Sequence, residues 1–335
     1  MSDPPPDLPY VSTGALPDGA RVQALVDEAL ARFRGETAGE TSRVYPALTR
    51  VPPGLFGICV AGVNGAVHSA GDCDVAFPIM SVAKPFTLAL ACEALGPDVV
   101  RREVGVNATG LPFNSMAAIE RDAGGRTNPM VNPGAMATAG LIPGADAAER
   151  WRALLDGLSR FAGRPLALDE EVYASASATN HRNRAAARLL YDYGRIAGDP
   201  AEVLDLYTRQ SSVSVAAGDL AVMGATLADG GVNPVTGARV VDPVTCRHVL
   251  SVMATAGLYE TSGDWLYEVG LPGKSGIGGG IVTVSPGKGG LGTFSPPLDA
   301  AGNSVRGRLV ARFLARSLGL ALFLSAPAEP DRPGA

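Results

Sequence analysis

The sequence predicts an α+β fold in which one antiparallel sheet is built from both ends of the chain. Apolar patterns typical of strands occur in five places: residues 56–61, 66–70, 265–269, 280–284 and 291–294. Between the second and third of these, from residue 81 to about residue 257, the apolar spacing is mainly helical. Because strands from distant segments must pair with one another, we expect a single sheet flanked by helices, with a helical lobe inserted.

Local signals support the individual elements. Asp18 precedes apolar residues at helical spacing over residues 22–33, so it is the expected N-cap of a first helix. Asn64-Gly65 marks a hairpin turn between the first two strands. Asp199 and Pro200 form a cap and first residue for a helix over residues 200–210. The other predicted helices cover residues 82–95, 151–161, 183–196, 219–228, 244–256 and 304–318.

The same pattern divides the chain into lobes. At 335 residues the chain is long for a single hydrophobic core. We expect a sheet lobe formed by residues 20–80 and 265–325, and a helical lobe formed by residues 81–264. Residues 1–19 and 326–335 are rich in proline and poor in apolar pattern, which predicts disordered tails.

Composition limits the classes of partner. A net charge of -5 provides no basic surface, which argues against nucleic acid or an anionic membrane as a partner. The first residues lack the features of a signal peptide, and no apolar run reaches membrane-spanning length. The four cysteines are scattered without a C-x-x-C pair, which predicts reduced, mostly buried thiols. We therefore expect a cytoplasmic, soluble protein with no metal and no other cofactor.

Lysine usage marks the positions where chemistry is expected. Only three of the 28 lysine and arginine residues are lysines, and two of these lie in motifs. Lys84 ends the S-x-x-K sequence Ser81-Val82-Ala83-Lys84, and Lys274 begins Lys274-Ser275-Gly276. Arginine can replace lysine on a surface, but not as a proton acceptor, because a guanidinium stays charged inside proteins. The two lysines therefore indicate sites that use an amine able to lose its proton.

Ser81 and Lys84 are predicted to form a nucleophile and its base. Residues three apart share a helix face, and Pro85 is tolerated only in the first turn, so the helix should begin at or just after Ser81. The serine hydroxyl then lies at the positive end of the helix dipole, beside unpaired N–H groups. A desolvated, neutral lysine can accept the serine proton. The alternative is a serine cap followed by a solvent-exposed lysine.

The glycines after Lys274 predict a close approach of backbone to the serine. Gly276 and residues 278–280 follow the lysine, whereas the glycines of a phosphate-binding loop precede it, so nucleotide binding is not expected. A glycine-rich strand that passes the nucleophile would let backbone N–H groups stabilise an oxyanion. The alternative is a flexible lead into a hairpin.

Taken together, the two lysine motifs resemble those of the serine β-lactamase and penicillin-binding superfamily. Most of the chain, roughly residues 20–320, resembles one branch of it, the bacterial and mitochondrial glutaminases. The matching segments are Tyr45-Pro46, 77–86, 128–135, Arg182-Asn183, 207–210, 219–221, 257–259, 269–281, 294–299 and 302–304. The resemblance implies a β-lactamase/transpeptidase-like fold, hydrolysis of L-glutamine to L-glutamate and ammonia, and a homo-oligomer. None of the asparagines follows Ser or Tyr by two positions, as a penicillin-recognising enzyme would require.

The resemblance also implies residue roles. Ser81 is the nucleophile, Lys84 is its base, and the N–H groups of Ser81 and Ile277 form the oxyanion hole. Tyr45 and Tyr259 relay protons near the serine, with Lys274 in support. The amino-acid end of glutamine is held by four residues: Asn132, Asn183, Tyr207 and Tyr259.

One position departs from the family pattern. The family has Ser-Glu seven to eight residues before the asparagine of Arg-Asn, and that glutamate receives the α-ammonium of the substrate. This chain has Ser175-Ala176 there. Loss of a charge-assisted hydrogen bond weakens binding by about 10- to 100-fold. Two alternatives therefore stay open: a related serine amidohydrolase with an altered substrate, and a catalytically silent relative.

Overall fold

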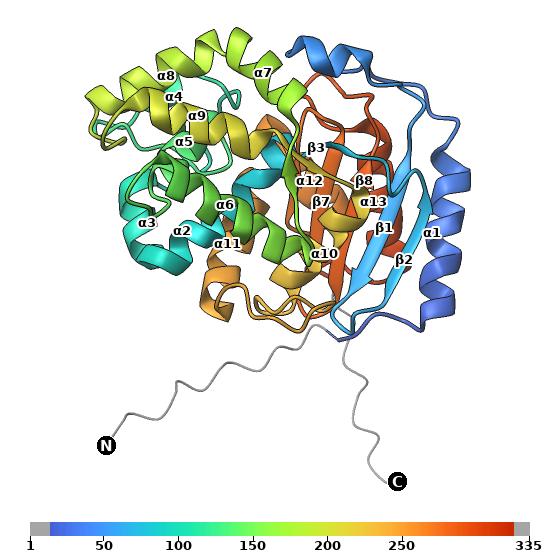
Figure 1. The fold of residues 1–335 in the computed structure, drawn as a ribbon. Helices are drawn as coiled ribbons and strands as arrows, with labels where there is room; N and C mark the ends of the chain where they lie inside the picture. The colour runs from blue at the N-terminus through green and yellow to red at the C-terminus, as the bar shows by residue number, and fades with distance from the viewer. Residues whose placement is uncertain (1–13, 325–335) are drawn as a thin grey trace, which may run out of the picture.

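A five-stranded antiparallel sheet lies at the centre of one side of the molecule (Figure 1). The structure, a computed structural model, describes residues 14–324, so most of the first predicted tail and all of the second lie outside the described residues. The strand order is β2-β1-β8-β7-β6, and every neighbouring pair is antiparallel. The strands are β1 (Gly57–Gly62), β2 (Val67–Gly71), β6 (Gly273–Ser275), β7 (Gly280–Ser285) and β8 (Gly289–Phe294). Early and late segments therefore pair directly, which confirms the predicted sheet.

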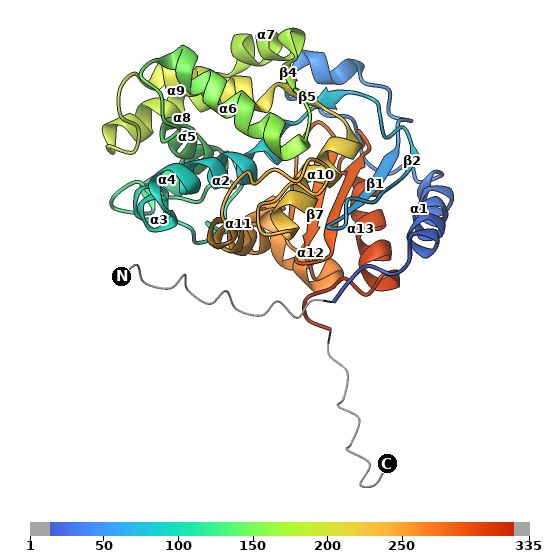
Figure 2. The ribbon, with the colours of Figure 1, turned by 60° about the horizontal axis from the view of Figure 1, so that its bottom comes forward.

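Helices cover both faces of this sheet. Successive side chains of β1 point to opposite faces, so each face offers apolar residues against which helices can pack. Ile58 and Val60 belong to an apolar cluster with helix α1 (Gly19–Phe33) and helix α13 (Val305–Ser317). Cys59 and Ala61 point the other way and cluster with helix α10 (Ala217–Ala228). The two views of the ribbon show α10 on one side of the sheet, with α1 and α13 on the other (Figure 2).

Two glycines of β8 let α10 lie unusually close to the sheet. A Cβ atom at Gly290 would lie 2.3 Å from the carbonyl oxygen of Ala221, and one at Gly292 would lie 2.1 Å from that of Ala217. Both distances are far inside van der Waals contact, so only glycine fits at these positions. The close packing fixes α10 against the sheet.

The rest of the chain forms a mainly helical part beside the sheet (Figure 1). Its helices are α2 (Ala83–Leu95), α3 (Pro97–Val104), α4 (Ala117–Glu120), α5 (Asn132–Gly140), α6 (Ala147–Ala162), α7 (Glu170–Thr179), α8 (His181–Asp192), α9 (Pro200–Ser211) and α11 (Pro243–Ala256). Helix α12 (Ser262–Val269) packs instead on the sheet side, where Trp265 and Val269 belong to the apolar cluster of α1 and α13. A small sheet of order β3-β5-β4 joins the two parts, with β3 (Phe77–Pro78), β4 (Ala167–Leu168) and β5 (Val213–Val215). Three short 3-10 helices are η1 (Pro46–Arg50), η2 (Met80–Val82) and η3 (Tyr259–Thr261).

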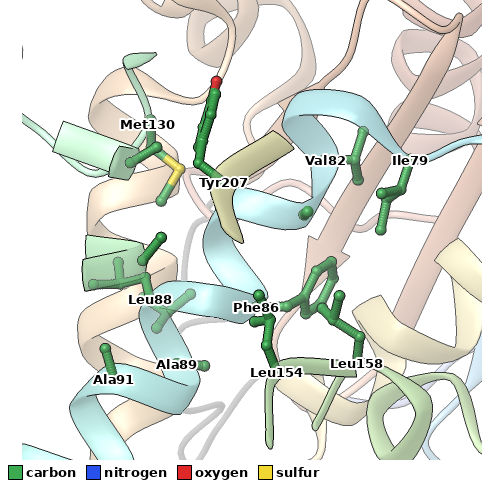
Figure 3. Close-up of a cluster of buried hydrophobic side chains, with 14 of the residues drawn as sticks. Ile79, Val82, Phe86, Leu88, Ala89, Ala91, Met130, Leu154, Leu158 and Tyr207 are labelled. Atoms are coloured by element: carbon green, nitrogen blue, oxygen red, sulfur yellow. The ribbon is translucent and has the colours of Figure 1, made fainter. Parts of the chain in front are cut away.

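Helix α2 passes through the middle of the largest hydrophobic core. Phe86 points between Leu154 and Leu158 of α6, and all three side chains are fully buried (Figure 3). Tyr207 lies at the edge of this cluster, and its hydroxyl is turned away from the apolar side chains (Figure 3). Because α2 is buried on nearly every side, its N-terminus is held rigidly in the interior.

Most predicted elements are confirmed, with caps where the sequence placed them. Asp18 accepts a hydrogen bond from the Arg21 N–H, and Asp199 accepts one from the Ala201 N–H. The four cysteines are unpaired, and three of them are buried, as expected. Among residues 14–324, no helix is both long enough and apolar enough to cross a bilayer.

Two secondary-structure predictions were wrong. Residues 265–269, predicted as a strand, belong to helix α12. Trp265 and Val269 lie one turn apart and are both buried, and Gly270 ends the helix in a left-handed conformation. A short, mostly apolar segment is compatible with a strand or a helix, and here tertiary packing selected the helix. The helix predicted over residues 183–196 is also shorter, because α8 ends at Asp192.

Candidate active site

Ser81 lies at the junction between the small sheet and the helical part. It is the middle residue of η2, which leads directly into α2, and Pro85 falls in the first turn of α2. The α-helix therefore begins at Ala83, two residues after Ser81, and Pro85 falls where its missing N–H is tolerated. Met80, the residue before Ser81, has a φ of 49°, a left-handed conformation that costs a non-glycine residue about 1–3 kcal/mol. Such strain is typical of functional sites.

Lys84 is buried one turn from Ser81 and has a neutral partner. Its side chain is 1% exposed, and its Nζ donates to Asn132 Oδ1 at 2.8 Å and to the Met130 carbonyl oxygen at 3.3 Å. Burial lowers the pKa of Lys84 to about 7, because desolvation disfavours the ammonium. The solvent-exposed alternative is therefore wrong for this lysine. Its amine is neutral in a substantial fraction of molecules at neutral pH.

Lys274 is a second buried amine, on strand β6. Its Nζ donates to the carbonyl oxygens of Gly257 at 2.9 Å and Ser275 at 2.7 Å, and it lies 4.3 Å from the centre of the Tyr259 ring. Burial lowers the pKa of Lys274 well below its usual value, and the nearby charge of Lys84 lowers it further. The backbone carbonyls and the aromatic ring fix this side chain in one position.

Tyr259 packs between Lys274 and the loop before α4. Its hydroxyl donates to the Ser275 carbonyl oxygen at 3.2 Å, and its ring lies 4.7 Å from that of Phe113. Burial raises the pKa of Tyr259 to about 12, although hydrogen bonds to Ser81 and Ser275 act in the opposite direction. The phenol is thus protonated at neutral pH and lies within hydrogen-bonding range of Ser81.

The turn that presents Tyr259 is strained and held by side chains. Tyr259 has a φ of 58°, and with Met80 it is one of two non-glycine residues with positive φ in residues 14–324. Ser262 Oγ accepts from the Leu258 N–H at 3.0 Å and donates to the Tyr259 carbonyl oxygen at 2.8 Å. Both strained residues therefore flank the same serine.

Two asparagines continue the hydrogen-bond chain from Lys84. Asn132 is the first residue of α5, and its Nδ2 donates to Oδ1 of Asn183 on α8 at 3.1 Å. Both carboxamides are buried. Since each carboxamide has donors and acceptors, the pair extends polar character from the lysine across three helices without adding charge.

A cavity of about 130 Å³ opens beside Ser81. Six of the predicted site residues line it: Tyr45, Ser81, Asn132, Asn183, Tyr207 and Ile277. The structure brings these together from six separate segments of the chain. The other three predicted residues, Lys84, Lys274 and Tyr259, are buried around Ser81 and do not line the cavity. The remaining lining residues, which sequence reasoning did not single out, are Val44, Met80, Phe113, Asn114, Thr179, Asn180, Arg182 and Ser211.

The glycine-rich turn after β6 packs on the backbone just before Ser81. A Cβ atom at Gly278 would lie 2.6 Å from the Pro78 carbonyl oxygen, and one at Gly276 would lie 3.0 Å from that of Ile79. The Ile277 N–H between them has no hydrogen-bond acceptor among the described residues. A free backbone donor thus lies on a turn that is held against the serine segment.

Asn303 supports this arrangement and was missed as a site residue. Its Oδ1 accepts from Ser275 Oγ at 2.5 Å, and its Nδ2 donates to Thr261 Oγ1 at 3.0 Å. The buried carboxamide thereby joins the strand of Lys274 to the turn of Tyr259. Gly302-Asn303-Ser304 belonged to the matched segments, but only the fold shows which side chains it connects.

Ala176 lies on the second turn of α7. Its side chain is buried, and Thr179 and Asn180, three and four residues later, both line the cavity. Residues at these spacings share a helix face. Ser175 Oγ accepts from the Ala47 N–H at 3.2 Å, which ties α7 to the segment that carries Tyr45. Among the described residues, no aspartate or glutamate lines the cavity.

Fold and site together define a member of the β-lactamase-like class of hydrolases, with an S-x-x-K serine facing a K-S-G strand. A glutaminase family model matches residues 39–323. Glutaminase 2 of Yersinia pestis is 64% identical over 320 residues, which covers 96% of this chain and 94% of the relative. A glutaminase of Brucella canis is 49% identical over 302 residues, covering 90% and 95% of the two chains.

Solved structures agree with the sequence matches. The probable glutaminase ybaS has a TM-score of 0.90 and 44% identity, over 92% of this chain and all of that one. Mglu in its glutamate form has a TM-score of 0.87 and 38% identity, over 91% of this chain and 70% of that one. The chain belongs to the glutaminase family. It is a glutaminase-type amidohydrolase.

Proposed function

We propose that this protein hydrolyses L-glutamine to L-glutamate and ammonia through an acyl-enzyme on Ser81. The observation that carries the proposal is the buried Lys84 amine, one turn from Ser81, with a pKa lowered to about 7 and a carboxamide partner. An amine in this state can accept the serine proton at neutral pH. Relatives named as glutaminases over nearly the whole chain support glutamine as the amide.

In the proposed first step, Ser81 Oγ attacks the side-chain carboxamide carbon of the substrate while Lys84 Nζ takes the hydroxyl proton. The N–H groups of Ser81 and Ile277 stabilise the oxyanion. The C–N bond then breaks, and the nitrogen leaves as ammonia after gaining a proton, with the Tyr259 and Tyr45 phenols as relays. Water attacks the ester carbon in the second step, releases glutamate and returns the proton to Ser81.

Substrate binding is assigned to the cavity side chains. Asn132, Asn183 and Tyr207 line it, and Tyr259 lies next to Ser81. Burial raises the pKa of Tyr207 well above its usual value, so this phenol is neutral and can donate to a substrate carboxylate. Lys274 supports the site by holding Tyr259 and the β6 backbone.

The test is ammonia release from glutamine by the purified protein and its variants. Ser81→Ala should lose activity by at least about 1,000-fold, because no nucleophile replaces the hydroxyl. Ser251→Ala is the matched control, since Ser251 is exposed on α11 and only bonds back to the Arg247 carbonyl oxygen. An electrophilic glutamine analogue should label Ser81, as read by mass spectrometry. Labelling elsewhere, or full activity in Ser81→Ala, would reject the mechanism.

A second candidate is a serine amidohydrolase with an altered amide substrate, favoured by Ala176 and by a cavity to which residues 14–324 contribute no carboxylate. A third, a catalytically silent relative, predicts no ammonia release from any amide. Buried Lys84 and the free Ile277 N–H support the two active candidates over the silent one. A cytoplasmic location and a homo-oligomeric state stay predictions, from composition and family resemblance respectively.

A further inference from the structure

The side chains that line the cavity carry charge of one sign, which is positive. Of the side chains that residues 14–324 place in its lining, only Arg182 carries a permanent charge, and the others are apolar, hydroxyl, phenol or carboxamide groups. Arg182 Nε donates to the Asn114 carbonyl oxygen at 2.7 Å, and no carboxylate lies within 4.0 Å of its guanidinium among the residues described. From the described part of the chain, a substrate therefore meets one positive side chain without a carboxylate partner and no negative side chain.

Acidic residues occur near the site, but they do not line the substrate cavity. Glu260 and Asp299 both raise the pKa of Tyr259, but neither lines the cavity. Asp299 Oδ1 accepts hydrogen bonds from the N–H groups of Ala301 and Asn303, at 3.0 and 2.9 Å. A substrate ammonium in the cavity would thus leave water without gaining a carboxylate partner, and an unpaired buried charge is costly.

Ala176 is the place where a carboxylate would complete the cavity. Its side chain is 3% exposed and does not itself line the cavity, but Thr179, three residues later on the same face of α7, and Asn180, which ends the helix, both do. An alanine at this point offers no polar atom to a substrate. A longer acidic side chain from the same helix position would project toward the lining that Thr179 and Asn180 form.

We propose that the site selects substrates by their carboxamide and carboxylate groups and does not require a free α-ammonium. The favoured class is thus the ω-carboxamide monoanion, represented by 4-carbamoylbutyrate, which differs from glutamine by the missing amine. This inference rests on the proposed amide hydrolysis at Ser81. Water adds across the amide, the C–N bond breaks, a C–O bond forms, and the products are glutarate and ammonia. Arg182 attracts the carboxylate of either substrate, but only glutamine must desolvate an ammonium.

The experiment compares kcat/KM for glutamine and 4-carbamoylbutyrate in three proteins. In the wild type, 4-carbamoylbutyrate should be used at least as well as glutamine, or within about threefold of it. Ala176→Glu should shift the ratio toward glutamine by about 10- to 100-fold, the range for one charge-assisted hydrogen bond. Ala176→Gln has nearly the same shape without the charge, and its ratio should stay within about threefold of the wild type.

The outcomes separate this inference from the function on which it rests. If the wild type releases ammonia from both amides but prefers glutamine by more than about tenfold, another group binds the α-ammonium. This inference is then rejected, while the proposed hydrolysis at Ser81 stands. If neither amide releases ammonia, the proposed hydrolysis fails as well. Should Ala176→Glu not fold, calorimetry on Ser81→Ala measures binding without turnover. Glutamine bound more than about tenfold tighter than 4-carbamoylbutyrate would then overturn the proposal.

Discussion

The Nζ atom of Lys84 lies 2.8 Å from Oδ1 of Asn132, so the buried amine is held by a neutral carboxamide. A carboxylate at this distance would stabilise the ammonium and keep the lysine charged. A carboxamide accepts the hydrogen bond without adding charge, so desolvation controls the pKa, which falls to about 7. The pair therefore keeps a fraction of Lys84 unprotonated near neutral pH. Substitutions of either residue test this.

Asn132→Asp should convert the partner into a carboxylate and raise the pKa of Lys84. An opposite charge at this range shifts a pKa by about 1–3 units, so the acidic limb of kcat/KM should move to higher pH by that amount. From a pKa of about 7, a shift of this size should lower activity at pH 7 by about 5- to 500-fold, with partial recovery at high pH. Asn132→Ala is the control, because it removes the hydrogen bond without adding charge. A limb that stays in place in Asn132→Asp would show that Lys84 is not the titrating base.

The wild-type pH profile should report Lys84 directly. The active form is the neutral amine, which is populated above its pKa of about 7, so kcat/KM for ammonia release should rise through that pH and then level off. Below the pKa, each pH unit should cost about tenfold. A profile that is flat from pH 5.5 to 8 would contradict the assignment.

Lys84→Arg keeps the positive charge but removes the base. Arginine cannot be deprotonated in this pH range, so turnover should fall by about 10²–10⁴-fold, the usual cost of losing a general base. Glutamine binding to the folded variant should be retained, which calorimetry can check. More than about a tenth of the wild-type turnover would mean that the lysine acts only through its charge.

Gly278→Ala should damage catalysis through the backbone. The added Cβ would lie 2.6 Å from the Pro78 carbonyl oxygen, so the turn that carries Ile277 must move away from the Ser81 segment. A displacement of this kind can cost about 100-fold in turnover, while the thermal unfolding midpoint should fall only slightly. Gly218→Ala is the matched control, because its Cβ on α10 would meet nothing within 4 Å and alanine favours a helix. Equal activities in Gly278→Ala and Gly218→Ala would show that the turn has no part in catalysis.

Sequence patterns predicted the sheet from both chain ends, the start of α2 after Ser81, and most helix positions. These features follow from local rules: apolar periodicity, caps such as Asp18, and the missing N–H of Pro85. The same rules failed at residues 265–269, because a five-residue, mostly apolar segment fits a strand or a helix equally well. Burial of Trp265 against the sheet helices settled that choice.

By itself, the sequence determined which chemistry is present: a scarce lysine one helical turn from a serine, a second lysine before a run of glycines, and no acid at position 176. Only the tertiary structure decided the state of these groups. Burial beside Asn132 lowers the pKa of Lys84, and the contact between Gly278 and Pro78 places the Ile277 N–H. Pairing and desolvation depend on residues far apart in the chain, so no local pattern contains them.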